Sequence, residues 1–113
     1  MNLVKETEND EPILKFSPLA VKDIKETWQY LSEQDEEIAA NLIRKITAKC
    51  EFLYRNPKIG RERNDLITNL RQFPFKNYNI FYFQTESGVE IYRILHSSRD
   101  NIQIFDDVIE YAK

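Results

Sequence analysis

The stretch YNIFYFQTESGVEIYRILH, Tyr78–His96, decides the fold of this 113-residue chain. Apolar and polar residues alternate on both sides of "TESG", as in two strands whose successive side chains point to opposite faces of a sheet. We therefore predict strands at Tyr78–Gln84 and Val89–His96, joined by a turn. The same alternation extends back to a third strand at Asn69–Phe75, in which Pro74 lacks a backbone donor and so indicates a sheet edge or a bulge.

Upstream of these strands the apolar spacing changes to the three-and-four spacing of helices. A short strand, Ile13–Phe16, is followed by Ser17, a helix-capping residue, and by Pro18, which suits a first helical position. A second helix is predicted to begin after Asp35 and to end near Arg55, before "NP". The predicted buried faces comprise Val21, Ile24, Trp28 and Leu31 in the first helix and Ile38, Leu42, Ile43, Ile46, Cys50 and Leu53 in the second.

The predicted order is β-α-α-β-β-β plus a C-terminal element. The helical hairpin and the small, mainly antiparallel sheet each leave an apolar face uncovered, so packing one on the other gives an α+β two-layer domain. Residues 13–113 are expected to form this single domain, and residues 1–12 a disordered leader. Gly60 is expected to give backbone freedom to the loop before the sheet. The C-terminal element is interpreted as a helix or as a short strand followed by a helix, with one helical face formed by Ile102, Phe105, Ile109 and Ala112.

The composition is typical of a soluble cytoplasmic protein without a metal or cofactor. No apolar run reaches the roughly 20 residues of a membrane span. A single cysteine and a single histidine exclude a disulfide framework and a metal cluster. Residues 55–76 carry a local charge of +4 and residues 100–113 carry −3, within a net charge of −3. Because these charges form no broad cationic face, nonspecific nucleic-acid affinity is not expected, nor is sequence-specific DNA binding by this chain alone, and the charge pattern fits a protein partner at least as well.

The histidine lies in a small cluster of reactive residue types. His96 ends the last predicted strand, and Arg99 and Asp100 follow it. A base that titrates near neutrality, beside a guanidinium and a carboxylate, could cleave a phosphodiester. The same residues could instead pair with each other, fasten the end of the strand or contact a partner. Elsewhere, Trp28 and Cys50 are interpreted as core residues, Cys50 as an unreactive one.

Several spaced motifs together form a family signature. They are Ala20-x-x-Asp23-Ile24-x-x-Thr27-x-x-Tyr30-Leu31, then Leu53-x-x-x-Pro57-x-x-Gly60-Arg61, then Leu70-Arg71-x-Phe73-Pro74, then Tyr78-x-Ile80-Phe81-Tyr82, and finally Arg93-Ile94-Leu95-His96-x-x-Arg99-Asp100. In this order they resemble the RelE/ParE superfamily of toxins from bacterial type II toxin–antitoxin systems, and the ParE branch most closely, over about residues 13–105. The positions of Asp23 and Tyr30 within the helix motif favour structural roles.

The resemblance implies one of two activities on a RelE/ParE-like fold. RelE-like members are ribosome-dependent messenger RNA endoribonucleases, whereas ParE-like members bind and poison DNA gyrase. Aligned by motif, Asn79 falls where RelE-like enzymes have an arginine and Phe105 where they have a tyrosine, and phenylalanine cannot transfer a proton. A gyrase-poisoning toxin without catalytic residues is therefore favoured. An endoribonuclease using His96, Arg99 and Arg71 is the alternative, and a relative that has lost its toxicity is a third interpretation.

The resemblance also implies a cognate antitoxin. Its extended or helical segment is expected to cover the surface near Arg71, Arg93 and the C-terminal tail, in a hetero-oligomer, with a toxin homodimer as another assembly. The candidate target- or partner-binding residues are Arg61, Arg63, Arg71, Arg93, His96, Arg99, Asp100 and Phe105.

Overall fold

The computed structural model describes residues 13–98 and Phe105 of the chain. The predicted leader and all of the predicted C-terminal element except Phe105 lie outside these residues. The elements are β1 (Ile13–Phe16), α2 (Pro18–Ser32), α3 (Glu36–Arg55), β2 (Arg61–Glu62), β3 (Leu70–Phe75), β4 (Tyr78–Thr85) and β5 (Gly88–His96).

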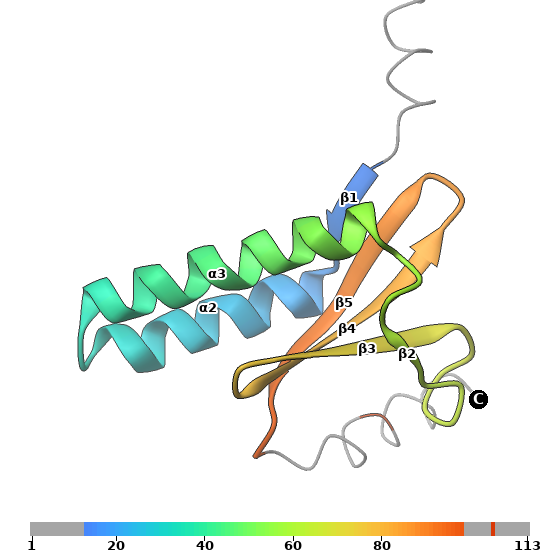
Figure 1. The fold of residues 1–113 in the computed structure, drawn as a ribbon. Helices are drawn as coiled ribbons and strands as arrows, with labels where there is room; N and C mark the ends of the chain where they lie inside the picture. Colours follow the sequence, from blue (N-terminus) through green and yellow to red (C-terminus); the bar gives the residue numbers. More distant parts are fainter. Residues whose placement is uncertain (1–12, 99–104, 106–113) are drawn as a thin grey trace, which may run out of the picture.

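The strands form one five-stranded sheet in the order β1-β5-β4-β3-β2 (Figure 1). β1 pairs with β5 in parallel, beginning with Ile13 opposite Gly88, and the other neighbours are antiparallel. Gly88 has a φ of +153°, and a Cβ atom there would lie 2.0 Å from the carbonyl oxygen of Ile13. Only glycine therefore fits where β1 begins to pair with β5. The α+β class and the mainly antiparallel sheet are confirmed, whereas the short strand β2 was not predicted.

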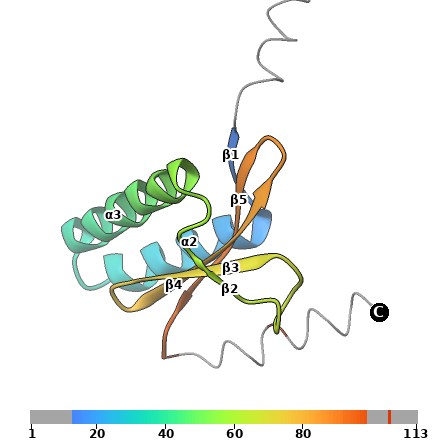
Figure 2. The same ribbon diagram turned by 45° about the vertical axis from the view of Figure 1, so that its right-hand side comes forward.

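The two helices run antiparallel as a hairpin and lie against one face of the sheet (Figures 1 and 2). Their starts follow the predicted capping chemistry. The Ser17 side chain accepts a hydrogen bond from the backbone N–H of Ala20, and Pro18 occupies the first turn of α2. The carboxylate of Asp35 accepts from the N–H groups of Glu37 and Ile38. The sequence thus specifies both helix starts locally.

A β-bulge interrupts the alternation along β5. Tyr82 pairs with Ile91 but Phe81 pairs with Arg93, which leaves Tyr92 as the extra residue. The side chains that face the helices therefore change from odd to even positions along β5, from Ile91 to Ile94. The hydroxyl of Ser17 donates to the carbonyl oxygen of Tyr92 at 2.7 Å, so the start of α2 is attached to the bulge.

Apolar residues cover both faces of the sheet. The helix-side core includes Ala20, Ile46, Cys50, Leu53, Ile80, Tyr82, Val89, Ile91 and Ile94. The core on the opposite face contains Leu66, Leu70, Phe81, Leu95 and Phe105. Cys50 is fully buried, and burial raises the pKa of its thiol to about 12, in keeping with an unreactive core residue.

Three predictions about the helix faces were wrong. Val21 and Trp28, assigned to the buried face of α2, each keep 38% of their surface exposed, and Ile38, assigned to the buried face of α3, keeps 58%. Trp28 instead borders a shallow surface depression together with Ile24 and Ile43. The hairpin extends beyond the sheet at the end where its helices are joined, so apolar residues there have no sheet beneath them (Figure 1).

Gly60 is required by close packing rather than by an unusual backbone angle. Its N–H donates to the Tyr82 hydroxyl at 2.8 Å, and the same hydroxyl donates to the carbonyl oxygen of Pro57 at 2.8 Å. A Cβ atom at Gly60 would lie 2.4 Å from that hydroxyl oxygen. Tyr82 therefore fastens the Pro-x-x-Gly loop to the centre of the sheet, and burial raises the pKa of its phenol.

Tyr82→Phe is expected to lower the free energy of unfolding by about 1–3 kcal/mol, because the buried N–H of Gly60 loses its acceptor. Urea denaturation followed by circular dichroism measures the change. Tyr30→Phe is the matched control, since Tyr30 is 67% exposed, and it should stay within about 0.5 kcal/mol of the parent. Equal stability of the two variants would contradict the assigned role of Tyr82.

Candidate functional site

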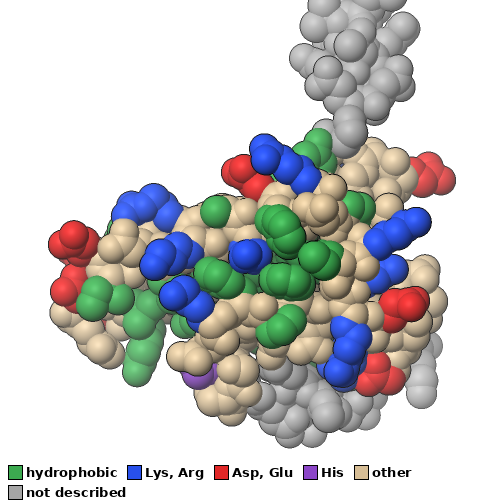
Figure 3. Space-filling view, viewed as in Figure 1, with side chains coloured by type: hydrophobic (Ala, Val, Ile, Leu, Met, Phe, Trp, Pro, Cys, Tyr) green, Lys and Arg blue, Asp and Glu red, His purple; other side chains and the backbone are tan. Residues whose placement is uncertain are grey.

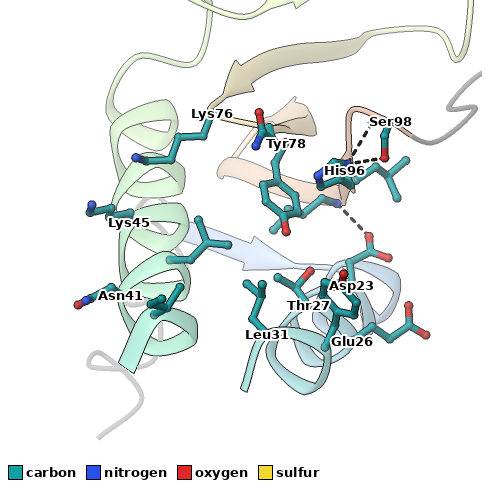
Figure 4. A pocket seen from close by; sticks show the side chains of 16 residues that line it. Asp23, Glu26, Thr27, Leu31, Asn41, Lys45, Lys76, Tyr78, His96 and Ser98 are labelled. Carbon is teal, nitrogen blue, oxygen red and sulfur yellow. Dashed lines mark hydrogen bonds between the residues drawn. The ribbon is translucent and has the colours of Figure 1, made fainter. Parts of the chain in front are cut away.

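A cavity of about 700 Å³ opens between the helical hairpin and the end of the sheet where β5 finishes. Figure 4 shows side chains from α2, α3 and the β3–β4 turn around it, with His96 and Ser98 from the end of β5. Its apolar lining includes Leu31, Leu42 and Ile94. Its polar and charged lining comprises Asp23, Glu26, Thr27, Tyr30, Asn41, Lys45, Lys76, Asn77, Tyr78, His96 and Ser98.

His96 is held in one orientation at the edge of this cavity. Its ring meets the Tyr78 ring edge-on, with centroids 5.1 Å apart. Its Nδ1 atom lies 3.1 Å from the backbone N–H of Ser98 and 2.6 Å from the Ser98 hydroxyl oxygen. Because a backbone N–H can only donate, Nδ1 accepts the hydrogen bond from the Ser98 backbone. This contact and the Tyr78 ring together fix the orientation of the imidazole at the cavity edge.

Asp23 and Arg93 form the most buried ion pair among the described residues. Arg93 donates through Nε and Nη2 to the two carboxylate oxygens, each at 2.9 Å, and the backbone N–H of Ile94 donates to the same carboxylate at 2.9 Å. The side chains are only 13% and 5% exposed. The hydrogen bonds that Arg93 donates to the Asp23 carboxylate raise the pKa of Arg93. The structural role expected for Asp23 is confirmed, and Arg93, expected at a partner surface, has its guanidinium directed to α2.

The predicted basic loop is partly neutralised by its own contacts. Arg63 pairs with Asp65 at 2.9 Å and also donates to the side-chain oxygen of Gln72. This pairing raises the pKa of Arg63 and lowers that of Asp65. Arg71 donates to the carbonyl oxygens of Lys58 and Gly60, at 3.1 and 2.7 Å. Arg61 is exposed on β2, so it is the arginine of this loop that is most accessible to a partner.

The structure does not bring Arg71 and His96, two of the proposed catalytic residues, together. Arg71 is aligned through Tyr82 with Ile91, five residues before His96 on β5. At about 3.3 Å per residue, their backbones are separated by roughly 15 Å or more. Phe105 is fully buried on the sheet face opposite the helices, where its ring centroid lies 4.7 Å from that of Phe81. Arg99 and Asp100 lie outside the described residues, and Phe105 acts as a packing residue here.

Asn79 takes part in a side-chain network within the sheet. It is 9% exposed, and its side-chain oxygen accepts a hydrogen bond from the Gln72 amide at 2.9 Å. Gln72 in turn accepts from Arg63. This neutral, internally bonded amide occupies the position that carries an arginine in RelE-like enzymes, so it provides no positive charge for a phosphate.

Three residues that share the cavity with His96 were not predicted as site residues, namely Lys45, Lys76 and Tyr78. Lys76 lies in the two-residue turn between β3 and β4, and Tyr78, the first residue of β4, pairs with His96 across the sheet. The predicted strand pairing could therefore have identified Tyr78. Lys45 depends on how α3 is rotated against the sheet, which the sequence pattern does not specify. Among the described residues, no group of three or more His, Cys, Asp or Glu could hold a metal ion, and no helix is long and apolar enough to cross a membrane.

Comparison with known proteins gives one family. The family described as "ParE toxin of type II toxin-antitoxin system, parDE" matches residues 14–101. The fold is similar to a solved chain described as "Chromosomal ParDE TA system from P. aeruginosa", with a TM-score of 0.66 and 16% sequence identity over 78% of this chain and 97% of that one. No curated protein matches the sequence. The family match spans most of the described domain, and the chain therefore belongs to the ParE toxins of type II toxin–antitoxin systems.

Proposed function

We propose that this toxin acts in the cytoplasm by binding and poisoning DNA gyrase, without cleaving RNA, and that a cognate antitoxin neutralises it. The observation that carries the proposal is the separation of the groups that RNA cleavage would need. Cleavage through the 2′-hydroxyl requires a base, a proton donor and a positive charge around one phosphate. Arg71 and His96 are far apart along the sheet, Phe105 has no hydroxyl and is buried on the opposite face, and Asn79 is uncharged.

An antitoxin has two surfaces available for docking. The His96 cavity combines an apolar lining with lysines from α3 and from the β3–β4 turn, and the basic loop presents Arg61 beside Arg71. A segment that folds on binding could fill the first and reach the second. This arrangement supports a hetero-oligomer in which the antitoxin separates the toxin from its target.

One observation favours a second function, ribosome-dependent RNA cleavage. His96, Tyr78, Lys45 and Lys76 line a single cavity, and together they offer a ring N–H, a phenol and two ammonium groups. These groups could bind a phosphate and transfer protons at it without Arg71. The two functions differ in what they require of His96.

Induced expression in bacteria, with translation and chromosome breaks followed in parallel, tests the proposal. Growth arrest with broken chromosomes and continuing translation is expected. His96→Ala should reduce toxicity by about tenfold at most, the size of one lost surface contact of up to about 1.4 kcal/mol. Loss of a general acid or base would instead lower the rate of RNA cleavage about 10²–10⁴-fold. An immediate stop in translation with intact chromosomes, abolished by His96→Ala, would reverse the assignment.

A further inference from the structure

Lys49 on α3 is surrounded by aromatic rings. Its Nζ atom lies 4.8 Å from the ring centroid of Phe52, 5.4 Å from that of Phe75 and 5.8 Å from that of Phe73. Phe52 and Phe73 contact each other, with centroids 6.1 Å apart, and Lys76 lies 5.9 Å from the Phe75 ring. The helix positions of Lys45, Lys49 and Phe52, spaced by four and three residues, place them on one face of α3. We call the set Lys45, Lys49, Phe52, Phe73, Phe75 and Lys76 the Lys49 surface.

This surface is both accessible and unneutralised. Phe52 is 37% exposed, and Phe73 and Phe75 are half-buried. Figure 3 shows apolar side chains gathered between α3 and the sheet, with basic side chains among and around them. Among the described residues, the ion pairs are Arg63–Asp65 and Arg93–Asp23, so none of the three lysines has a carboxylate partner within the described chain.

The elements that build this face place no acidic side chain on it. β3 and β4 contain no aspartate or glutamate. The glutamates of α3 are Glu36, Glu37 and Glu51, and at about 100° per residue they lie about 120° or more around the helix from Lys49. An apolar centre with uncompensated lysines is therefore complementary to a ligand that carries carboxylates around an apolar group.

A protein segment fits these contacts better than a nucleic acid. Bases bind aromatic side chains by stacking on open ring faces. Here the Lys49 ammonium lies over the rings of Phe52, Phe73 and Phe75, so a base could stack on them only by displacing it. A carboxylate can pair with the ammonium from outside and leave the cation–π contacts intact.

The edge of β3 limits how such a segment can bind. The carbonyl oxygen of Leu70 accepts from the N–H of Arg63, so Leu70, Gln72 and Pro74 direct their backbone groups to the open side of the sheet. β2 pairs only with Arg71 and Gln72, and beyond them Pro74 offers no N–H. A strand added at this edge would find no backbone N–H at Pro74 to donate to its carbonyl oxygen. Recognition by side chains is therefore favoured over addition of a full strand.

We infer that the Lys49 surface docks an acidic segment of a partner protein. Carboxylates of the segment pair with the three lysines, and an apolar side chain packs on Phe52 and its neighbouring rings. This inference goes beyond gyrase poisoning and stands without it, because it concerns the chemistry of the ligand rather than the identity of the target. Binding should weaken with rising salt, since the charged pairs lie at the surface.

A random peptide library displayed on phage and selected on the full-length protein tests the inference. The enriched peptides should carry carboxylates flanking apolar residues. Lys49→Met keeps the length of the side chain but removes the charge. It should lower the affinity of these peptides about tenfold, because one charge-assisted contact is lost. Lys22→Met, at an exposed lysine of α2, makes the same charge change away from the surface and should leave binding within twofold.

Three outcomes of the peptide selection would overturn the inference. Selection could yield no peptide above background, or peptides without carboxylates, or peptides that bind Lys49→Met and the parent equally. Oligothymidylate is titrated in parallel, and binding of this strand in preference to the acidic peptides would assign the surface to nucleic acid. Circular dichroism of each variant shows that it is folded. None of these readouts uses gyrase, so failure here and failure of the gyrase proposal are distinguishable.

Discussion

Asp23→Ala is expected to lower the free energy of unfolding by about 3–5 kcal/mol, because it leaves the Arg93 guanidinium largely buried without its carboxylate. The backbone N–H of Ile94 loses its acceptor in the same change. Asp23 links α2 to the end of β5, so the variant should also loosen the strand that leads to His96. Urea denaturation gives the change in stability, and amide hydrogen exchange at Ile94 reports the local effect.

Two further variants separate the buried pair from other effects. Glu26→Ala removes a carboxylate from an exposed position of the same helix and should change stability by less than about 0.5 kcal/mol. The double variant Asp23→Leu/Arg93→Met removes both charges together, so it should recover much of the loss seen in Asp23→Ala. A loss below 1 kcal/mol in Asp23→Ala, or no recovery in the double variant, would contradict this account.

Phe105→Ala is expected to lower the free energy of unfolding by about 3–5 kcal/mol, the range for deleting a buried aromatic side chain. The Phe105 ring is fully buried and contacts the rings of Phe81 and Tyr92, with centroids 4.7 and 6.2 Å away. Its loss would open a cavity on the sheet face opposite the helices. The same denaturation experiment measures the effect.

Phe52→Ala is the matched control for Phe105. It deletes the same side chain from a position that is 37% exposed, and the cost should be below about 2 kcal/mol. Similar losses in the two variants would mean that Phe105 does not close the second core. The fold would then depend on the helix-side core alone.

Local chemistry made much of the fold predictable. Ser17, Pro18 and Asp35 mark both helix starts by hydrogen bonds to residues within one turn. The two-residue separation between Phe75 and Tyr78 predicted a hairpin, which the pairing of these residues confirms. These features depend on neighbours in the sequence, so they can be recognised without knowing the tertiary structure.

Long-range geometry explains what the sequence pattern missed. Strict alternation along β5 would place Ile91 and Leu95 on one face, but the bulge at Tyr92 moves Leu95 to the opposite core. Trp28 has helical core spacing, yet it is 38% exposed and borders a surface depression between the two helices with Ile24 and Ile43. A helix pattern identifies an apolar face but not the length of that face that a sheet covers.

The candidate site was harder to predict for the same reason. The pair of Asp23 and Arg93 joins residues 70 positions apart, and each residue alone resembled a surface charge or a motif position. His96 was singled out from the sequence, but its neighbours Tyr78 and Lys45 come from a paired strand and a packed helix. Closeness in sequence to Arg99 and Asp100 suggested a catalytic cluster, whereas the described neighbours in space form a cavity lined by both apolar and charged side chains.

Gyrase poisoning by this ParE toxin requires that the toxin docks on gyrase itself. Purified protein, free of antitoxin, is added to gyrase and relaxed plasmid, and in parallel to ribosomes programmed with messenger RNA. We expect that supercoiling stops and that linear plasmid accumulates, while the transcript stays intact. Cleavage of the transcript on the ribosome, with supercoiling unaffected at the same toxin concentration, would contradict it.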